Sequence, residues 1–266
     1  MSDQYAWQLA HEAAVAYEKD FVPAIFAQWP PVLAEIANVT AGERVLDVAC
    51  GTGILAREMA ARVGPTGRVS GLDLNEGMLA VARRLQPEVD WRQGDAARLP
   101  FEDKAFDVVA SQFALMFFPD RIAAIREMSR VLAPRGRLVV AVCAPIAQTK
   151  GYSELARILR GEAGEEAAAM VEGYFALGDQ GVLRGLCKAA DIAGARILTR
   201  EGWARFASID EFIRIEIKGS PLAALVDEAS YQRVLKAARQ ELRDFCDTQG
   251  RVSIRLDATI VTAGKP

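Results

Sequence analysis

The sequence predicts an α/β protein built on a doubly wound, mostly parallel sheet. Between residues 43 and 145, short runs of apolar and β-branched residues alternate with helical stretches. This alternation is typical of βαβ units, in which a crossover helix returns the chain to a parallel strand. Glycine and proline in 64–67 and 132–136 supply the turns that such units need between their elements.

Each element follows from this alternation. The predicted strands are 43–49, 67–74, 89–95, 105–114 and 136–144, and the predicted helices are 53–63, 76–85 and 120–132. After residue 145 the rhythm changes: 151–193 and 208–248 are mainly helical, whereas 195–207 and 253–264 are predicted strands. A helical segment rich in Trp, Tyr and Phe precedes residue 40, and we expect it to form a lid, with a packed flank as the alternative.

Composition excludes several classes of protein. The chain has 266 residues, enough for one large domain or a domain with an elaborated cap. Its net charge of −3 offers no basic surface for a nucleic-acid backbone. The sequence predicts no membrane span, no signal peptide and therefore a cytoplasmic protein. Four scattered cysteines and one histidine predict free thiols and no metal site.

A glycine turn follows the first predicted strand. Gly51 and Gly53 allow a tight turn that brings the backbone close to a ligand, and the helix start that follows favours a negative ligand group. Together with Ala56 they satisfy the G-x-G-x-x-G/A pattern of dinucleotide-binding folds. The turn alone therefore leaves a nicotinamide enzyme open.

Three carboxylates narrow the choice. Asp47 lies within the first strand, where a nicotinamide fold needs only apolar packing; its structural alternative is to cap a local turn. Asp73 ends the second strand, 22 positions after Gly51, where an acid can accept hydrogen bonds from both ribose hydroxyls, unless it is merely a solvent-facing strand end. Asp95 follows the third strand, where it can accept a hydrogen bond from an exocyclic amine such as that of adenine.

At this point the sequence resembles a known family. "VLDVACGTG" (45–53), "GLDLNEGML" (71–79), "GDAARLPFEDKAFDVV" (94–109) and "SQFALMFFPD" (111–120) resemble the class I S-adenosylmethionine-dependent methyltransferases. The resemblance is closest to the small-molecule branch that includes ubiquinone and menaquinone C-methyltransferases, and it covers about residues 40 to 145. Ala49 stands where that family usually has glycine.

The resemblance implies a Rossmann-like methyltransferase fold of seven strands, with 255–264 inserted antiparallel, and S-adenosylmethionine as cofactor. Asp47 would face the methionine ammonium, the backbone of Ala49, Gly51 and Gly53 would cradle that end, and Asp73 would bind the ribose. The remaining implied contacts are Leu74 and Met78 beside the adenine, Asp95 and Ala96 at its edge, and Gln112 and Phe113 near the methionine and sulfonium.

Methyl transfer is an in-line displacement that depends mainly on positioning, and it needs a general base only where the acceptor keeps its proton. The catalytic residues therefore stay unassigned, with His11 and Tyr17 as weak candidates. Met116, Phe117 and Phe118 predict an apolar or aromatic acceptor wall, or simply pack the following helix.

We expect two regions: an N-terminal helical segment plus cofactor core (1–145), and helical cap insertions plus the last strands of the same sheet (146–266). The predicted function is methyl transfer to O, C or N of a small, fairly apolar metabolite. The alternatives are a non-catalytic S-adenosylmethionine-binding protein and a nicotinamide-dependent oxidoreductase. The sequence does not indicate the oligomeric state or the acceptor.

Overall fold

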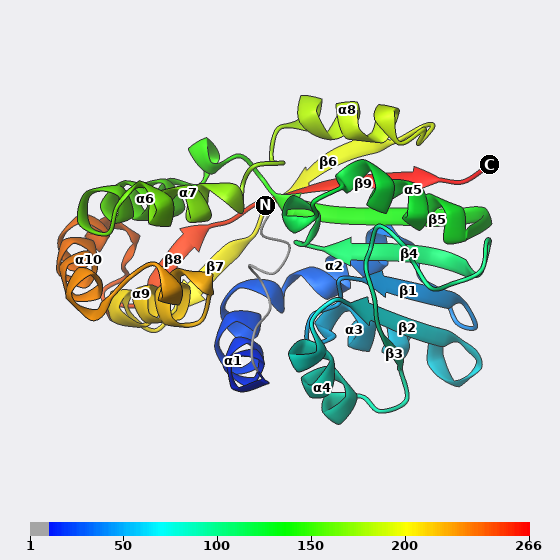
Figure 1. Ribbon diagram of the computed structural model, residues 1–266, viewed down its shortest axis with the longest axis horizontal. Coiled ribbons are helices and arrows are strands. Elements are labelled where there is room, and N and C mark those ends of the chain that lie inside the picture. The colour runs from blue at the N-terminus through cyan, green and yellow to red at the C-terminus, as the bar shows by residue number, and fades with distance from the viewer. Residues whose placement is uncertain (1–10) are drawn as a thin grey trace.

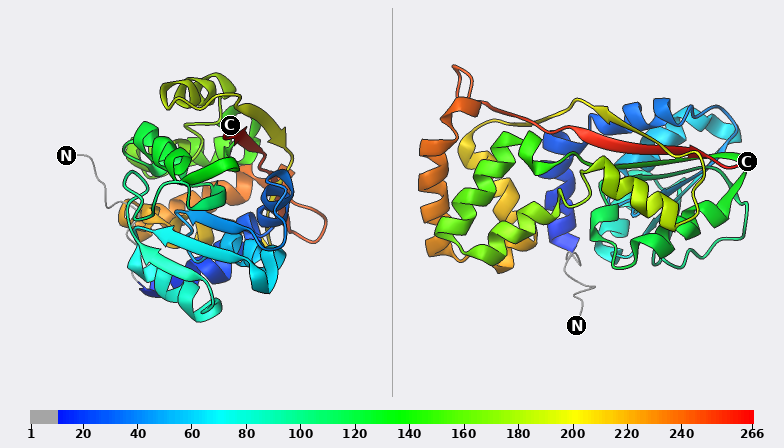
Figure 2. Two further views of the ribbon diagram at one scale, coloured as in Figure 1. Left: turned by 90° about the vertical axis from the view of Figure 1, so that its right-hand side faces the viewer. Right: turned by 90° about the horizontal axis from the view of Figure 1, so that it is seen from above.

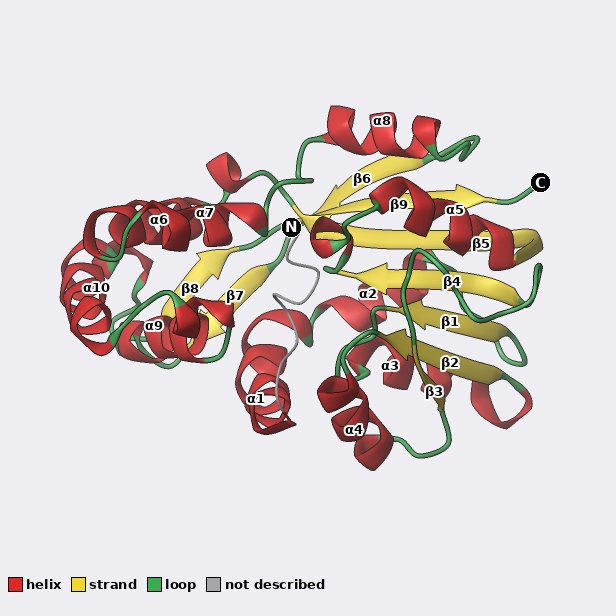
Figure 3. Ribbon diagram, in the orientation of Figure 1, coloured by secondary structure: helices red, strands yellow, loops and turns green. Residues whose placement is uncertain are grey.

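The structure is a computed structural model that describes residues 11–266. It has a lobe built on a seven-stranded sheet and a second, mainly helical lobe beside it (Figure 1). The carboxyl ends of the parallel strands point toward the helical lobe (Figure 3). In an open α/β sheet this edge is where ligands bind, so the helical lobe covers the edge of greatest functional interest.

The main sheet has the strand order β3-β2-β1-β4-β5-β9-β6. Its strands are β1 Arg44–Val48, β2 Arg68–Asp73, β3 Asp90–Gln93, β4 Phe106–Gln112, β5 Leu132–Cys143, β6 Arg196–Arg200 and β9 Ala258–Gly264. β1, β2, β3, β4 and β5 pair in parallel, whereas β9 runs antiparallel to β5 and β6. The predicted fold class, with seven strands and one antiparallel insertion, is confirmed.

Two predicted strands are each divided in the structure. The segment predicted as 195–207 forms β6 and then β7 (Trp203–Phe206), and the segment predicted as 253–264 forms β8 (Val252–Arg255) and then β9. β7 and β8 pair with each other outside the main sheet, so the prediction that 255–264 enters that sheet as one strand is wrong at its start.

The division has a local cause. Both strands leave the main sheet at Gly202 and Leu256, where the Leu256 amide donates to the Gly202 carbonyl at 2.8 Å. The buried Asp257 side chain accepts the Gly202 amide and is paired with Arg255. A Cβ on Gly202 would lie 2.2 Å from the Trp29 indole, so only glycine fits at this crossing. The alternation of apolar residues in the sequence does not reveal where a strand leaves one sheet and joins another.

Helices cover both faces of the main sheet. They are α2 Trp29–Ile36, α3 Ile54–Val63, α4 Glu76–Leu85, α5 Arg121–Val131 and α8 Gln180–Ala189. In the view of Figure 1, α2 and α3 lie behind the sheet and α5 in front of it. Asn75, Asp120 and Asp179 accept hydrogen bonds from first-turn amides, which satisfies donors that helix geometry leaves without partners.

The helical lobe confirms the mainly helical prediction for 151–193 and 208–248. It consists of α6 Lys150–Glu162, α7 Glu165–Gly173, α9 Ile209–Lys218 and α10 Glu228–Glu241, together with the β7–β8 pair. α8, which falls within the first of these ranges, packs instead against α5 and β6 of the sheet lobe.

The segment before the first strand lies between the two lobes (Figure 2). It comprises α1 His11–Ala16 and the π-helical stretch Tyr17–Phe26, followed by α2. Glu18 pairs with Arg57 of α3 at 2.7 Å, and Asp20 pairs with Arg214 of α9 at 2.8 Å. The segment is therefore tied to the sheet lobe on one side and to the helical lobe on the other.

Trp91 of β3 packs tightly over two glycines near the carboxyl edge. A Cβ on Gly71 of β2 would lie 2.3 Å from the indole ring, as would a Cβ on Gly53. Because Trp91 is buried and its Nε1 donates to the Gln86 carbonyl at 2.8 Å, the ring has little freedom to move away.

We predict that Gly71→Ala destabilises the fold by roughly 1–3 kcal/mol, the usual cost of overpacking a well-filled core. Gly185→Ala is the control, because it adds a Cβ to an exposed helical position with no atom within 4 Å. That variant should be neutral or more stable by up to about 1 kcal/mol. Urea unfolding measures both, and equal effects would show that the contact with Trp91 is not tight.

Candidate cofactor and acceptor cavity

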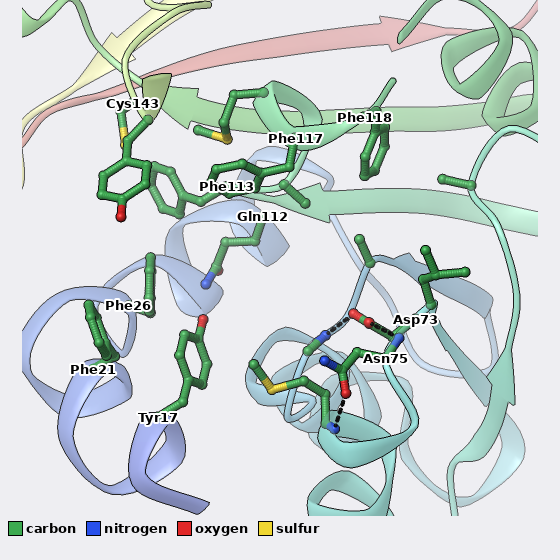
Figure 4. A pocket seen from close by; sticks show the side chains of 18 of the residues that line it. Tyr17, Phe21, Phe26, Asp73, Asn75, Gln112, Phe113, Phe117, Phe118 and Cys143 are labelled. Carbon is green, nitrogen blue, oxygen red and sulfur yellow. Dashed lines mark hydrogen bonds between the residues drawn. The ribbon is translucent and has the colours of Figure 1, made fainter. Parts of the chain in front are cut away.

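A cavity of about 420 Å³ lies at the carboxyl edge of the sheet. Its wall comes from four parts of the chain: the N-terminal segment, the loops after β1, β2, β3 and β4, the end of β5, and the helical lobe. The wall is predominantly aromatic and aliphatic with a few polar groups, as is usual for small-molecule sites. Figure 4 shows Tyr17, Phe21 and Phe26 on one side and Asp73 with Asn75 on the other.

The glycine turn adopts the backbone conformation that its sequence predicts. Ala49, Gly51 and Gly53 all have positive φ, of 56°, 56° and 85°. Ala49 and Gly51 line the cavity, whereas Gly53 caps α3 and contacts Trp91 instead. Alanine at positive φ is strained, which explains why glycine suits position 49 better.

Asp73 ends β2 beside the turn and lines the cavity. Its Oδ2 accepts the Gly51 amide at 2.7 Å and its Oδ1 accepts the Asn75 amide at 2.8 Å (Figure 4). Burial raises the pKa of this carboxyl, and the backbone amides of Asn75, Gly51 and Leu74 oppose the shift. Since each carboxylate oxygen has two lone-pair sites, both oxygens can accept a further hydroxyl hydrogen bond.

Asp47 lies beneath the turn and is not part of the cavity wall. It is 1% exposed, and its Oδ2 accepts the Ala56 amide in the first turn of α3 at 3.0 Å. No described residue donates a hydrogen bond to its Oδ1. Burial raises the pKa of Asp47 to about 8, with the Asp73 charge adding to the shift and the Ala56 amide and Arg57 opposing it.

The other predicted cofactor residues meet in the cavity. Leu74, Met78, Asp95, Ala96, Gln112 and Phe113 all line it. The Asp95 side chain accepts the Ala97 amide at 2.8 Å, and the Gln112 side chain points into the cavity (Figure 4). Phe113 has a positive φ of 52°, which is unusual for an aromatic residue and places its ring against Phe26 and Trp29.

Sequence reasoning missed Asn75, whose buried side chain caps α4 by accepting the Met78 amide at 3.1 Å. The signal was available, because asparagine directly before a predicted helix is a common N-cap.

All the acceptor-wall and base candidates line the cavity except His11. Tyr17 lines the cavity and stacks on Phe21 and Phe26, with ring centroids 5.6 and 5.7 Å apart. Burial, followed by the Asp73 and Glu18 charges, raises the Tyr17 pKa. His11 is exposed at the start of α1 and does not line the cavity. Met116, Phe117 and Phe118 all line it.

Four polar or nucleophilic residues of the wall had no signal in the sequence. Glu216 of α9, Tyr152 of α6, Tyr174 after α7 and Cys143 at the end of β5 all line the cavity. The Tyr152 hydroxyl donates to Glu216 Oε1 at 2.5 Å, and Glu216 is 1% exposed. Burial raises the Glu216 pKa to about 7, and the Tyr152 hydrogen bond opposes the shift.

This fold and this cavity define the class of protein. The sheet order with one antiparallel strand, the glycine turn and the acid that ends β2 are features of the class I S-adenosylmethionine-dependent methyltransferase fold. Residues 46–140 match the family model described as a methyltransferase domain. The matched part of the chain is similar to quinone C-methyltransferases.

One relative is the ubiquinone/menaquinone biosynthesis C-methyltransferase UbiE of Pseudomonas putida, 44% identical over 118 residues. That match covers 42% of this chain and 46% of the relative, so the chain matches about half the length of such relatives. The helical lobe, which supplies Tyr152 and Glu216, lies outside residues 46–140.

Two solved structures share the fold over most of the chain. One is Haemonchus contortus phosphoethanolamine N-methyltransferase 2 in complex with phosphomonomethylethanolamine and S-adenosylhomocysteine, with a TM-score of 0.61 and 18% identity, covering 97% of this chain and 58% of that one. The other is the [4+2]-cyclase SpnF, with a TM-score of 0.55 and 23% identity, covering 91% and 81%.

Residues 11–266 lack the features of a membrane-spanning helix and of a metal site. No helix among them is both long enough and apolar enough to span a membrane. They also contain no group of three or more histidine, cysteine or acidic side chains placed to hold a metal ion.

We predict that Glu216→Gln changes how stability depends on pH. The folded protein binds the Glu216 proton more tightly than the unfolded chain does, so this group's contribution to stability is lost as pH rises through about 7. The unfolding free energy of the variant minus that of the wild type should therefore increase by on the order of 2 kcal/mol from pH 5 to pH 8.

Chemical unfolding at the two pH values measures this difference. The control is Glu166→Gln, which changes an exposed glutamate of α7 and should leave the difference from wild type independent of pH. A difference for Glu216→Gln that is also independent of pH would show that Glu216 is not a buried, titrating acid.

Proposed function

We propose that the protein transfers a methyl group from S-adenosylmethionine to a small, fairly apolar metabolite. The observation that carries the proposal is the pair of carboxylates at the glycine turn: Asp73 beside it and Asp47 beneath it. Both have raised pKa values because they are largely buried. A ligand that brings positive charge to this turn would relieve that cost.

The residues present fit this cofactor. Asp73 would accept the ribose hydroxyls, Leu74 and Met78 would flank the adenine, and Asp95 with the Ala96 backbone would meet its edge. Gln112 and Phe113 would lie toward the methionine, whose ammonium Asp47 would balance directly or through water. When bound, the cofactor supplies a methyl group already activated by its sulfonium.

The charge of the turn also separates the cofactor classes. S-adenosylmethionine carries an ammonium and a sulfonium, whereas a nicotinamide dinucleotide would bring a diphosphate toward the same turn. Asp47 lies directly beneath the turn, and its negative charge would repel a diphosphate. The oxidoreductase alternative is therefore the weaker one.

The remaining wall residues would bind and orient the acceptor. Tyr17, Phe26, Phe113 and Phe117 give the cavity broad apolar faces that exclude water and restrict a flat molecule to few orientations. Because the displacement needs the acceptor atom in line with the breaking C–S bond, such restriction supplies most of what the protein must add.

The comparisons support this proposal but do not identify the methyl acceptor. The nematode enzyme of the same fold was solved with S-adenosylhomocysteine, and the bacterial relative is a quinone C-methyltransferase by name. A quinone-like carbon acceptor is accordingly one of the acceptors to test. The cyclase shows that the fold also occurs in a protein named for a different reaction, so cofactor binding without methyl transfer remains the second candidate.

Two measurements test the proposal. Thermal shifts with S-adenosylhomocysteine and with NAD would identify the cofactor class, and we expect stabilisation only by the first. Incubation with methyl-labelled S-adenosylmethionine and a panel of phenols, quinols and amines should then give labelled product. Tight cofactor binding with no transfer to any panel member would favour the non-catalytic alternative.

We predict that Asp73→Ala weakens S-adenosylhomocysteine binding by roughly 10- to 150-fold, the worth of charge-assisted hydrogen bonds from two hydroxyls. Because Asp73 also holds the Gly51 and Asn75 amides, Asp73→Asn should be measured beside it to separate lost charge from a disturbed turn. Asp90→Ala is the control: Asp90 begins β3, does not line the cavity, and its loss should leave wild-type affinity. Calorimetry showing unchanged affinity for Asp73→Ala would place the ribose elsewhere.

We predict that affinity for S-adenosylhomocysteine rises with pH because Asp47 must ionise to balance the ligand's ammonium. With an unliganded pKa of about 8, Asp47 is mostly protonated at pH 6.5, so affinity should be roughly 10-fold higher at pH 8 than at pH 6.5. Asp47→Asn should bind more weakly at pH 8 and lose this dependence, while Glu216→Gln should retain it. The same slope in wild type and Asp47→Asn would remove Asp47 from the cofactor's charge balance.

A further inference from the structure

The end of the cavity under the helical lobe carries a polar group that the proposed cofactor contacts do not use. Glu216 and Tyr152 come from α9 and α6, which are separated along the chain but bring their side chains together there. Both residues line the cavity, and they are 1% and 3% exposed. A carboxylate so deeply buried costs free energy, so its presence in a ligand cavity calls for a function.

One hydrogen bond orients this carboxylate, and a second holds the backbone of the same residue. The Tyr152 hydroxyl donates to Glu216 Oε1 at 2.5 Å, and the Ser220 hydroxyl donates to the Glu216 backbone carbonyl at 2.5 Å. Within the described part of the chain, no lysine, arginine or histidine forms an ion pair with Glu216. The carboxylate is thus positioned but not neutralised.

Aromatic rings surround the pair. The Tyr152 ring lies 5.3 Å from Phe175 and 5.6 Å from Phe212, between ring centroids, and Tyr174 meets Phe117 edge to face at 6.0 Å. Phe117, Tyr152, Tyr174 and Phe175 line the cavity, whereas Phe212 packs behind Tyr152, and a flat, apolar molecule would match the four lining rings. Such a molecule would need one hydrogen-bond donor to satisfy the carboxylate.

We propose that Glu216 is the general base of the reaction and that the acceptor is an aromatic or enolic molecule with a hydroxyl group directed at it. This inference rests on the proposed methyl transfer. Glu216 takes the hydroxyl proton as the acceptor's electron pair forms a bond to the methyl carbon. The C–S bond breaks with its electron pair going to sulfur. Neutral S-adenosylhomocysteine, methylated acceptor and protonated Glu216 result.

The protonation behaviour of the site agrees with this role. The Glu216 pKa of about 7 lies where a general base works best, because the group is then both available and basic enough. The titratable groups that face it are Tyr152 from α6, Tyr174 after α7 and Cys143 from β5, and burial raises the pKa of each. All three stay neutral near pH 7, so Glu216 is the group that exchanges protons there.

The same features favour a hydroxyl over an amine as the donor. An ammonium ion has three N–H donors to satisfy in this largely aromatic end of the cavity, whereas a hydroxyl has one, which Glu216 accepts. Tyr152 is then a positioning residue: its hydrogen bond stabilises the ionised carboxylate and turns it toward the cavity.

Binding of two probe molecules tests the recognition. 2-Naphthol and 2-methylnaphthalene have the same shape and differ in the hydroxyl. By calorimetry at pH 8, with S-adenosylhomocysteine present, the wild type should prefer the naphthol at least about 10-fold, the worth of a hydrogen bond to a charged group. The preference should fall below about 3-fold in Glu216→Gln, stay intact in the surface control Glu166→Gln, and shrink in the wild type at pH 5.5.

Kinetics test the proton transfer. With the best hydroxylated acceptor from the label-transfer panel, Glu216→Gln should lower kcat/KM by roughly 100- to 10,000-fold and abolish the pH–rate limb near 7. Tyr152→Phe should move that limb to higher pH, because the ionised carboxylate loses a hydrogen bond. A purely structural Tyr152 would not move it.

The possible outcomes separate the two proposals. Failure of the wild type to bind S-adenosylhomocysteine would overturn both. Normal cofactor binding, with an equal naphthol preference in wild type and Glu216→Gln, would overturn only the role of Glu216. A wild-type preference for 2-naphthylmethylamine over the naphthol, lost in Glu216→Gln, would overturn the hydroxyl assignment. Loss of the hydroxyl preference together with the limb near pH 7 would support it.

Discussion

The Asp73 carboxylate organises the whole carboxyl edge of the sheet. By accepting the Gly51 and Asn75 amides it joins the turn after β1 to the start of α4, and it still presents both oxygens to the cavity. An ionised acid is suited to this because it accepts several hydrogen bonds at once and strengthens each one. The positions of the glycine turn and of the start of α4 depend on this one group.

Burying acids in and beneath one cavity has an energetic consequence for the fold. Asp47, Asp73 and Glu216 all have raised pKa values, and burial is the main cause for each. Their charges are compensated by amides and a phenol more than by cations. The fold is therefore less stable than its packing alone would suggest, and ligands that bring positive charge or protons recover part of that cost. The buried acids lower stability, and they are already in position to bind a ligand.

The second lobe makes the cavity more than a cofactor cleft. Its position is set by the N-terminal segment, through the Glu18–Arg57 and Asp20–Arg214 ion pairs, and by the two strands that cross at Gly202 and Leu256. These contacts bring α6 and α9 over the carboxyl edge. Small movements of either connection would change the acceptor end while leaving the cofactor end intact, because the two ends are built from different elements.

The sequence by itself determined the sheet lobe and the residues of the cofactor end. Periodicity, glycine turns and strand-end acids are local signals, and the helix predicted at 76–85 has those bounds in the structure. Asp47 shows the limit of such signals: a carboxylate in a strand was evident, but only the structure shows that it bonds the Ala56 amide beneath the turn.

Only the tertiary structure decided the division of the last strands, the placement of His11 outside the cavity and the pairing of Tyr152 with Glu216. In the sequence, Tyr152 and Glu216 are ordinary members of two amphipathic helices, 64 positions apart. Nothing local distinguishes a glutamate that faces solvent from one that faces a cavity. That difference arises when two helices from a separate lobe pack over the sheet edge, because long-range packing, and not local pattern, decides which side chains lose contact with water.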